Sequence, residues 1–188
     1  MSQQELLSRV THSLDEQGID YMVTGSFVSS IQGEPRSTHV IDLVVALTQT
    51  DADRFSEMFP DPEFYFSPHA VREAIERRRM FNLVDMEAGD KVDFWILTDH
   101  LFDASRFARK RREEAWGMAL NVSTPEDTIL AKLRWAKDSG GSEKQFTDAL
   151  RVYEVQSSLL DMAYLDEWAN RLGVSDILAR LKSEADPI

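Results

Sequence analysis

The sequence predicts an α/β protein, in which a mixed β-sheet with flanking helices is followed by a region that contains only helices. Short β-branched, apolar runs alternate with amphipathic segments as far as residue 122, and no strand pattern follows that point. Hydrophobic residues make up 43 % of the 188-residue chain, which suffices for a substantial core. We therefore expect an α/β domain over residues 1–122 and a helical region over residues 123–188 packed on it.

The first part of the chain alternates helical and extended segments. Apolar residues at helical spacing predict a helix over residues 3–17, and the apolar run 21–23 predicts a short buried strand. A second helix is expected to follow residues 24–26 and to end at about residue 32. Residues 38–47 are β-branched and apolar with a single charge, Asp42, which predicts a central strand. The other elements expected here are helices over residues 51–59, 69–79 and 101–113, a hairpin of strands over 81–86 and 91–97, and a strand over 116–122.

A strong helix start opens the second part of the chain. Residues 123–127 combine a capping residue, a proline in the first turn and two acidic side chains near the positive end of the helix dipole. Three or four helices are expected beyond it, with breaks at residues 139–141 and at Gly173.

Composition and missing motifs exclude several function classes. The chain has no cysteine, which excludes disulfides, thiolate metal sites and a cysteine nucleophile and fits a reducing compartment. Its start lacks the pattern of a signal peptide, and no apolar run is long enough for a membrane span, so we expect a cytoplasmic protein without a membrane partner. The four histidines lack zinc-site spacing, and the common P-loop, dinucleotide and serine-hydrolase motifs are missing.

Charge is unevenly distributed along the chain. The net charge of −12 argues against nonspecific binding of duplex nucleic acid by the whole molecule. Residues 72–112 nevertheless carry ten basic and eight acidic side chains, with basic clusters at residues 77–79 and 109–112. These clusters are interpreted first as solvated helix faces, and second as a local anion-binding face compatible with RNA.

Two aspartates lie in otherwise apolar predicted strands. On a regular strand Thr38, Val40 and Asp42 share one face, and Asp93 occupies a similar position in the strand over 91–97. A carboxylate in an apolar strand is costly unless it is paired, hydrogen-bonded or metal-bound. Asp42 and Asp93 are therefore a candidate Mg²⁺ site. The alternative is that both lie at strand ends and face water.

The step Gly25-Ser26 lies where a strand passes into a helix. Glycine allows the backbone to approach a ligand closely, and the amides of a helix N-terminus suit a phosphate. Phosphate at a helix start beside metal-binding carboxylates is the equipment of phosphoryl or nucleotidyl transfer. The alternative is that Ser26 is an ordinary helix cap.

Residues 21–26 and 36–44 resemble the nucleotidyltransferase superfamily. The signature of that superfamily is a Gly-Gly or Gly-Ser step, then 9–13 residues, then Asp-hydrophobic-Asp, with a third carboxylate on a following strand at the place of Asp93. The Arg36-x-Thr38 step ahead of the pair is typical of its minimal, antitoxin-like and abortive-infection-toxin-like branches. The resemblance implies Mg²⁺, or Mn²⁺ in its place, on Asp42 and Asp93.

The resemblance extends into the helical region. Residues 124–133 resemble the segment that opens the C-terminal helices of the family, where the abortive-infection branch has a triphosphate-contacting lysine, here Lys132. A downstream aspartate of that branch corresponds to Asp148. The resemblance thus implies that Gly25, Ser26, Arg36, Thr38 and Lys132 bind nucleotide, and that Asp148 joins the two metal-binding aspartates as a catalytic residue.

Val40 departs from the family pattern. It stands where the family has the first aspartate of its pair, so one of three metal-binding carboxylates is missing. Since metal stabilisation of the transition state is worth several kcal/mol, such a loss could slow transfer by orders of magnitude. An active enzyme with a reduced metal site, a pseudoenzyme that still binds nucleotide, and a variant of an otherwise active protein all fit the sequence.

Two functional hypotheses follow. The first is a nucleotidyltransferase-like protein that binds a nucleoside triphosphate with Mg²⁺ and transfers a nucleotidyl group to a hydroxyl of RNA, protein or a small molecule. The second is a catalytically impaired pseudo-nucleotidyltransferase that acts as an interaction or antitoxin-like protein, as a homodimer or with a cognate protein partner. Whether the chain is an enzyme at all depends on how much the loss at Val40 costs.

Overall fold

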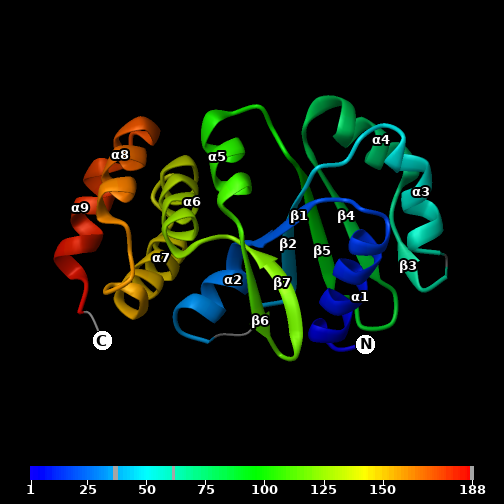
Figure 1. Cartoon of the computed structure of the whole chain (residues 1–188), viewed down its shortest axis with the longest axis horizontal. Coiled ribbons are helices and arrows are strands. Elements are labelled where there is room, and N and C mark those ends of the chain that lie inside the picture. The colour runs from blue at the N-terminus through cyan, green and yellow to red at the C-terminus, as the bar shows by residue number, and fades with distance from the viewer. Residues whose placement is uncertain (36–37, 61, 187–188) are drawn as a thin grey trace. The chain divides into compact units, whose positions relative to one another are not determined.

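The computed structural model describes residues 1–35, 38–60 and 62–186 (Figure 1). Its strands form one mixed seven-stranded sheet in the order β3-β4-β5-β2-β1-β7-β6, with helices around it, so the predicted α/β class is confirmed. Only β1–β7 and β2–β5 are parallel pairs among the described strands. The strands are β1 (Tyr21–Thr24), β2 (Val40–Val45), β3 (Phe64–Tyr65), β4 (Met80–Asp85), β5 (Lys91–Ile96), β6 (Arg111–Ala115) and β7 (Met118–Val122).

Contacts group the described residues into two compact units. The sheet unit consists of Met1–Thr24 and Thr38–Val122, and the helical unit consists of Gly25–Ser37 and Ser123–Ile188. The helices of the sheet unit are α1 (Gln3–Glu16), α3 (Asp51–Met58), α4 (Pro68–Arg77) and α5 (Leu101–Arg109). Contacts do not establish separately folding domains, so the division into residues 1–122 and 123–188 stays a prediction.

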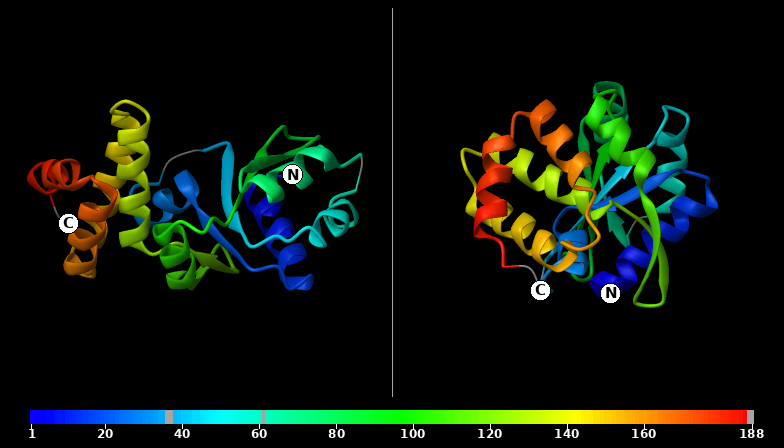
Figure 2. Two further views of the ribbon diagram at one scale, coloured as in Figure 1. Left: turned by 90° about the horizontal axis from the view of Figure 1, so that it is seen from above. Right: turned by 60° about the vertical axis from the view of Figure 1, so that its left-hand side comes forward.

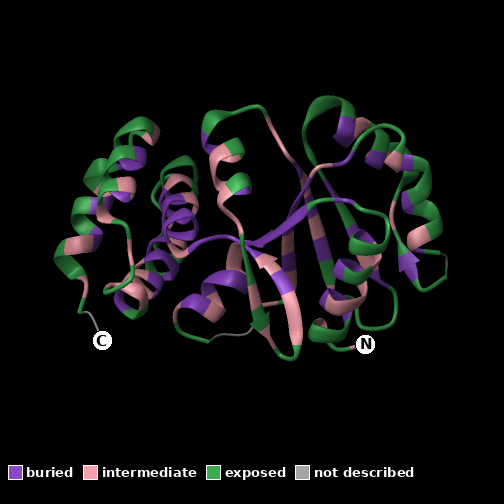
Figure 3. Cartoon of the chain, in the orientation of Figure 1, coloured by how far each residue is buried: buried purple, intermediate pink, exposed green. Residues whose placement is uncertain are grey.

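The two faces of the sheet differ in character. Burial alternates along β4 and β5 and along the first half of β2, as the colours of Figure 3 also indicate. One face is apolar, and Phe55 of α3 packs edge-on against Phe81 and Phe94, with ring centroids 5.1 and 5.2 Å apart. The other face carries Asp42 and Asp93 at mid-sheet. As expected from the sequence, β2 is the central strand of the seven.

Helices pack tightly in the helical unit. It contains α2 (Gly25–Gln32), α6 (Pro125–Asp138), α7 (Glu143–Gln156), α8 (Met162–Leu172) and α9 (Ser175–Glu184). Helices α6 and α7 pack along each other, and α2 packs on both, as the views of Figure 2 also show. Gly33 permits this packing, because a Cβ there would lie 2.9 Å from the backbone nitrogen of Val152 in α7. Thr124 caps α6 as the sequence predicts.

The helix expected over residues 101–113 is present, but its predicted C-terminal end is wrong. Helix α5 stops at Arg109, and Arg111–Ala115 instead form the edge strand β6, paired with β7. Trp116 and Gly117 both have positive φ, 50° and 74°, so they form the tight turn that joins these strands. The basic cluster at residues 109–112 therefore does not share one helix face, and the strand expected over 116–122 begins only at Met118. The two-residue strand β3 was not expected.

Among the described residues, no helix combines the length and the apolar character that crossing a membrane requires.

Candidate functional site

A row of polar side chains crosses the middle of the sheet. Asp42 of β2 is paired in register with Thr24 of β1 on one side and with Asp93 of β5 on the other. Asp93 is paired in turn with Asn82 of β4. Residues paired in this way point to the same face of a sheet, with strands about 4.8 Å apart. We call Thr24, Asp42, Asp93 and Asn82 the polar row; its two predicted carboxylates are direct neighbours.

Each carboxylate of the polar row accepts a side-chain hydrogen bond. The indole Nε1 of Trp95 donates to Oδ1 of Asp42 at 3.3 Å, and Nδ2 of Asn82 donates to Oδ1 of Asp93 at 2.5 Å. Both aspartates are partly exposed, whereas Thr24 is buried. The carboxylates are thus held in place by neutral donors and stay within reach of solvent.

Packing fixes the indole that donates to Asp42. Trp95 lies against a cluster made of Val44 from the neighbouring strand β2, Met22 from β1 and Phe107 from α5. The ring therefore has little freedom to rotate, and its N–H is aimed by the apolar core rather than by solvent.

Val40 and Thr38 lie at the start of β2. Val40 shares the face of Asp42, as the strand spacing predicts, and is paired in register with Lys91. The hydroxyl of Thr38 donates to the carbonyl oxygen of Val40 at 3.1 Å and lies 3.4 Å from its amide nitrogen, so it caps the strand locally. In this structure its hydroxyl is engaged with the backbone of its own chain.

The polar row can supply two carboxylates to a divalent cation. Carboxylate oxygens are preferred ligands of Mg²⁺, which usually takes one or two protein carboxylates together with waters and substrate phosphates. Neighbouring carboxylates on one partly exposed face, as Asp42 and Asp93 are, fit that requirement. No group of three or more histidine, aspartate or glutamate side chains suited to a metal occurs in the part of the chain that the structure describes.

The helical unit contains a second cluster, made of Ser26, Lys132 and Asp148. The Lys132 ammonium donates to Oδ2 of Asp148 at 2.8 Å and to Oγ of Ser26 at 3.1 Å. The side chains of Lys132 and Asp148 are only 6 % and 8 % exposed. The structure thus brings together three residues that the sequence resemblance assigns to one site, although 106 positions separate Ser26 from Lys132.

Gly25 begins the helix that carries Ser26. Its φ of +71° lies in the left-handed region that favours glycine, and it is the first residue of α2. The first turn of α2 contains no acidic side chain, so the positive end of the helix dipole is not offset there by a carboxylate of its own turn. Ser26 and Lys132 therefore place a hydroxyl and an ammonium group at a helix start.

Some residues of the candidate site fall outside what the sequence could indicate. Arg36, expected to bind nucleotide, lies outside the described residues. Trp95, Asn82 and Thr24 were not predicted, because their roles follow from strand register and packing. The signal that could have indicated Asn82 is an uncharged polar side chain inside a largely apolar strand that adjoins the strand of Asp93.

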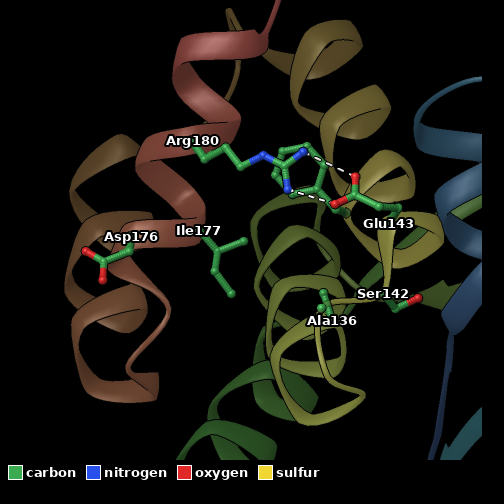
Figure 4. A pocket seen from close by; sticks show the side chains of 8 residues that line it. Ala136, Ser142, Glu143, Asp176, Ile177 and Arg180 are labelled. Atoms are coloured by element: carbon green, nitrogen blue, oxygen red, sulfur yellow. Dashed lines mark hydrogen bonds and ion pairs between the residues drawn. The ribbon is translucent and has the colours of Figure 1, made fainter.

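A shallow pocket of about 290 Å³ lies elsewhere in the helical unit (Figure 4). Arg180 crosses it and donates to both carboxylate oxygens of Glu143, at 3.0 and 3.2 Å, while its guanidinium lies 4.0 Å from the ring centre of Phe146. These hydrogen bonds lower the pKa of the Glu143 carboxyl. None of the predicted site residues lines this pocket. The contact between Arg180 and Glu143 links α9 to α7 there. Its lining residues are Ala136, Gly141, Ser142, Glu143, Phe146, Asp176, Ile177 and Arg180.

No protein-family model and no curated protein matches this sequence. Solved structures do match. The antibiotic-resistance factor ANT(2'')-Ia aligns with a TM-score of 0.57 and 12 % identity, over 94 % of this chain and 96 % of its own. The lincomycin-bound lincosamide antibiotic adenylyltransferase LnuA aligns with a TM-score of 0.56 and 12 % identity, over 81 % of this chain and 96 % of its own. The chain has the nucleotidyltransferase fold.

A third similar structure is an antigenic nucleotidyltransferase-like protein from Paracoccidioides brasiliensis. Its TM-score is 0.53 at 16 % identity, and the alignment covers 99 % of this chain and 96 % of that one. At these identities the similarity concerns the fold. It confirms the predicted architecture, and the assignment to the minimal or abortive-infection branch stays a prediction.

Proposed function

We propose that this chain is a nucleotidyltransferase that binds a nucleoside triphosphate with Mg²⁺ and transfers the nucleotidyl group to a hydroxyl acceptor. The observation that carries the proposal is the pairing of Asp42 with Asp93 on neighbouring strands of a sheet with this fold. Two like charges in register destabilise a sheet unless something binds them. A divalent cation is the ligand that fits two adjacent carboxylates.

Asp42 and Asp93 would hold the cation, with Mn²⁺ as an alternative to Mg²⁺. A bound cation supplies charge neutralisation of the phosphates and a lowered pKa for the attacking hydroxyl. The role of the two aspartates is to fix its position on the sheet. Because Val40 provides no carboxylate, water and phosphate oxygens would have to complete the coordination.

Gly25, Ser26 and Lys132 would bind the phosphates, with Arg36 and Thr38 as further contributors. A serine hydroxyl and a lysine at a helix start match the charge and hydrogen-bonding capacity of a phosphate. In sequence, Ser26 comes two residues after Thr24, the strand partner of Asp42. Whether groups from the two units act on one ligand is what the experiment below tests.

Asp148 would act on the acceptor. It is now balanced by Lys132, and it becomes available once a phosphate takes over the lysine. It would then orient the acceptor hydroxyl or accept its proton while the hydroxyl oxygen bonds to the α-phosphorus. The bond from that phosphorus to the bridging oxygen breaks, and pyrophosphate leaves with that oxygen. RNA, protein and small-molecule hydroxyls are all candidate acceptors.

One observation favours the second function, a pseudo-nucleotidyltransferase with an interaction or antitoxin-like role. Asp42 and Asp93 already have neutral donors in Trp95 and Asn82, and the family's first aspartate is replaced by Val40. Such a protein would keep the fold and act through a second copy of itself or a cognate protein partner.

Calorimetric titration with ATP, GTP, CTP and UTP, with and without Mg²⁺, tests both functions. We expect Mg²⁺-dependent binding that Asp42→Asn abolishes and Ser26→Ala weakens. Asp99→Asn is the matched control, because Asp99 belongs to the sheet unit with a side chain that is 94 % exposed. Loss of binding with changes in both units shows that they act on one ligand.

The negative outcomes separate the two functions. Binding that appears only in Val40→Asp supports the pseudoenzyme, with a site that lacks one carboxylate. Absence of binding in the native chain and in Val40→Asp alike rejects nucleotide binding altogether. Of the two candidate functions, only the interaction role would then remain.

A further inference from the structure

The side chains that donate to the two carboxylates lie outside every motif of the sequence. Trp95 follows Asp93 by two residues on β5, so both point to the same face. Asn82 is the strand partner of Asp93 on β4. Neither position carries a charge, and each contributes one N–H to one carboxylate oxygen.

The two donors are fixed in different ways. The Trp95 ring is held by Met22, Val44 and Phe107, so its N–H keeps one direction. Asn82 is exposed, and its short side chain reaches Asp93 because strand pairing places the two residues side by side. Both arrangements follow from packing and strand pairing within the sheet unit and require no ligand.

We propose that Trp95 and Asn82 are positioning residues that orient Asp42 and Asp93 toward a divalent cation. The inference rests on the proposed function, since it assigns how this chain prepares its cation site. A hydrogen bond to one oxygen restricts the rotation of a carboxylate and directs the other oxygen.

The same hydrogen bonds have a competing interpretation with the opposite sign. Trp95 and Asn82 could occupy oxygens that a cation would otherwise bind, and so replace the metal in a chain without catalysis. Removal of a positioning donor weakens cation binding, whereas removal of a competing donor strengthens it. The direction of the change therefore decides between the two.

The first experiment measures Mn²⁺ affinity by electron paramagnetic resonance. Trp95→Phe removes the N–H and keeps an aromatic ring, and Asn82→Ala removes the amide at an exposed position. We expect each change to weaken Mn²⁺ binding about tenfold, the lower end of the range for residues that orient metal ligands. Trp135→Phe and Asn170→Ala, both on exposed positions in the helical unit, are the matched controls and should leave the affinity unchanged.

The second experiment follows the Trp95 indole N–H of the native chain by nuclear magnetic resonance. The chain has four tryptophans, so its ¹H–¹⁵N spectrum has four indole signals. The Trp95 signal is identified by sequential assignment of the native chain, or as the signal that is missing in Trp95→Phe. We expect diamagnetic Mg²⁺ to shift this signal far more than that of Trp116, because the acceptor of the Trp95 N–H is Asp42. A purely structural tryptophan would not respond in this way, and Asp42→Asn should remove the response.

The outcomes distinguish this inference from the function on which it rests. If the native chain binds Mn²⁺ and both variants bind it equally well or more tightly, the positioning role is overturned and the proposed function stands. The same holds if Mg²⁺ binds without shifting the Trp95 signal. If the native chain binds neither Mn²⁺ nor Mg²⁺, even with a nucleoside triphosphate present, the proposed function fails and this inference fails with it.

Discussion

The carboxylates of the sheet unit and the ion pair of the helical unit differ in how their charges are compensated. Asp42 and Asp93 are like charges in register, partly exposed and held by neutral N–H donors. Asp148 is nearly buried and faces the ammonium group of Lys132 directly. The two carboxylates of the polar row repel each other, whereas the charges of Lys132 and Asp148 balance each other.

This difference indicates what each cluster contributes to the fold. Removal of a carboxylate from the polar row relieves repulsion, so the sheet does not depend on it for stability. Removal of one partner of a buried ion pair leaves an uncompensated charge in a low-dielectric interior, which is among the costliest single changes. The sheet therefore does not need both carboxylates for its stability, as expected if they bind a cation, whereas the ion pair of Lys132 and Asp148 contributes to the fold itself.

Asp148→Ala is expected to have the largest effect on stability. It removes the carboxylate that balances the buried Lys132 ammonium, and it should lower the free energy of unfolding by about 3–5 kcal/mol. Asp42→Ala should change the free energy of unfolding by less than about 1 kcal/mol. Urea unfolding monitored by circular dichroism measures both. The double variant Lys132→Met/Asp148→Leu, which removes both charges, should recover most of the loss. Equal costs for Asp148→Ala and Asp42→Ala would contradict the comparison.

Gly33→Ala tests the packing that holds the helix of Ser26 against α7. An added Cβ would lie 2.9 Å from the backbone nitrogen of Val152 and 3.0 Å from the carbonyl carbon of Arg151, and backbone atoms cannot easily yield. Overpacking of this kind costs about 1–3 kcal/mol. The neighbouring Glu34→Ala, which removes only an exposed ion pair with Arg151, is the control and should cost less than about 1 kcal/mol. An unfolding free energy for Gly33→Ala equal to that of the control would show that α2 can shift away from α7.

Val40→Asp tests the polar row in the opposite direction, by adding the carboxylate that the family pattern has. We expect Mn²⁺ affinity to rise about tenfold, which corresponds to about 1.4 kcal/mol, because a third oxygen ligand joins the same face. Val84→Asp is a closely matched control. Val84 and Val40 are both strand partners of Lys91, one on each side, and only Val40 lies on the strand of Asp42. An equal gain from both variants would mean that added charge, rather than a ligand, strengthens binding.

The sequence was sufficient to predict the parts that depend on local pattern. The apolar run with one charge marked β2 as central, and strand alternation placed Val40 with Asp42 on one face. The capping pattern at Thr124 marked the start of α6. These features depend on neighbours in sequence, where spacing and burial act directly.

Pairing register lay beyond the sequence. The expected loop over residues 87–90 implies that Met86 faces Lys91, which would set Val84 opposite Asp93. In the structure Val84 faces Lys91 instead, so Asn82 is the partner of Asp93. A shift of two residues keeps every side chain on its face, so the hydrophobic pattern could not distinguish the two registers.

The sequence did not indicate strand β6, whereas it did indicate Lys132, Ser26 and Asp148 as residues of one site. The two outcomes have different physical reasons. Basic residues at 109–112 looked helical, but the turn at Trp116 and Gly117 returns the chain to pair with β7, and pairing overrides local propensity. The meeting of Lys132 with Ser26 and Asp148 was assigned only through the family resemblance. No spacing rule connects residues 106 positions apart.

The smallest expected effect concerns the face of β1 opposite to the polar row. Tyr21 is fully buried there, and burial raises the pKa of its phenol above the ordinary value of 10.0. Since the folded protein favours the neutral phenol, this stabilisation is complete below pH 10 and is lost as pH rises through the folded-state pKa. Tyr21→Phe should therefore make the unfolding free energy fall less steeply with pH above pH 10, measured by urea unfolding at several alkaline pH values. Equal slopes for Tyr21→Phe and the native chain would mean that the apolar face admits a charge as readily as the polar row does, which would remove the basis for treating the two faces as different environments.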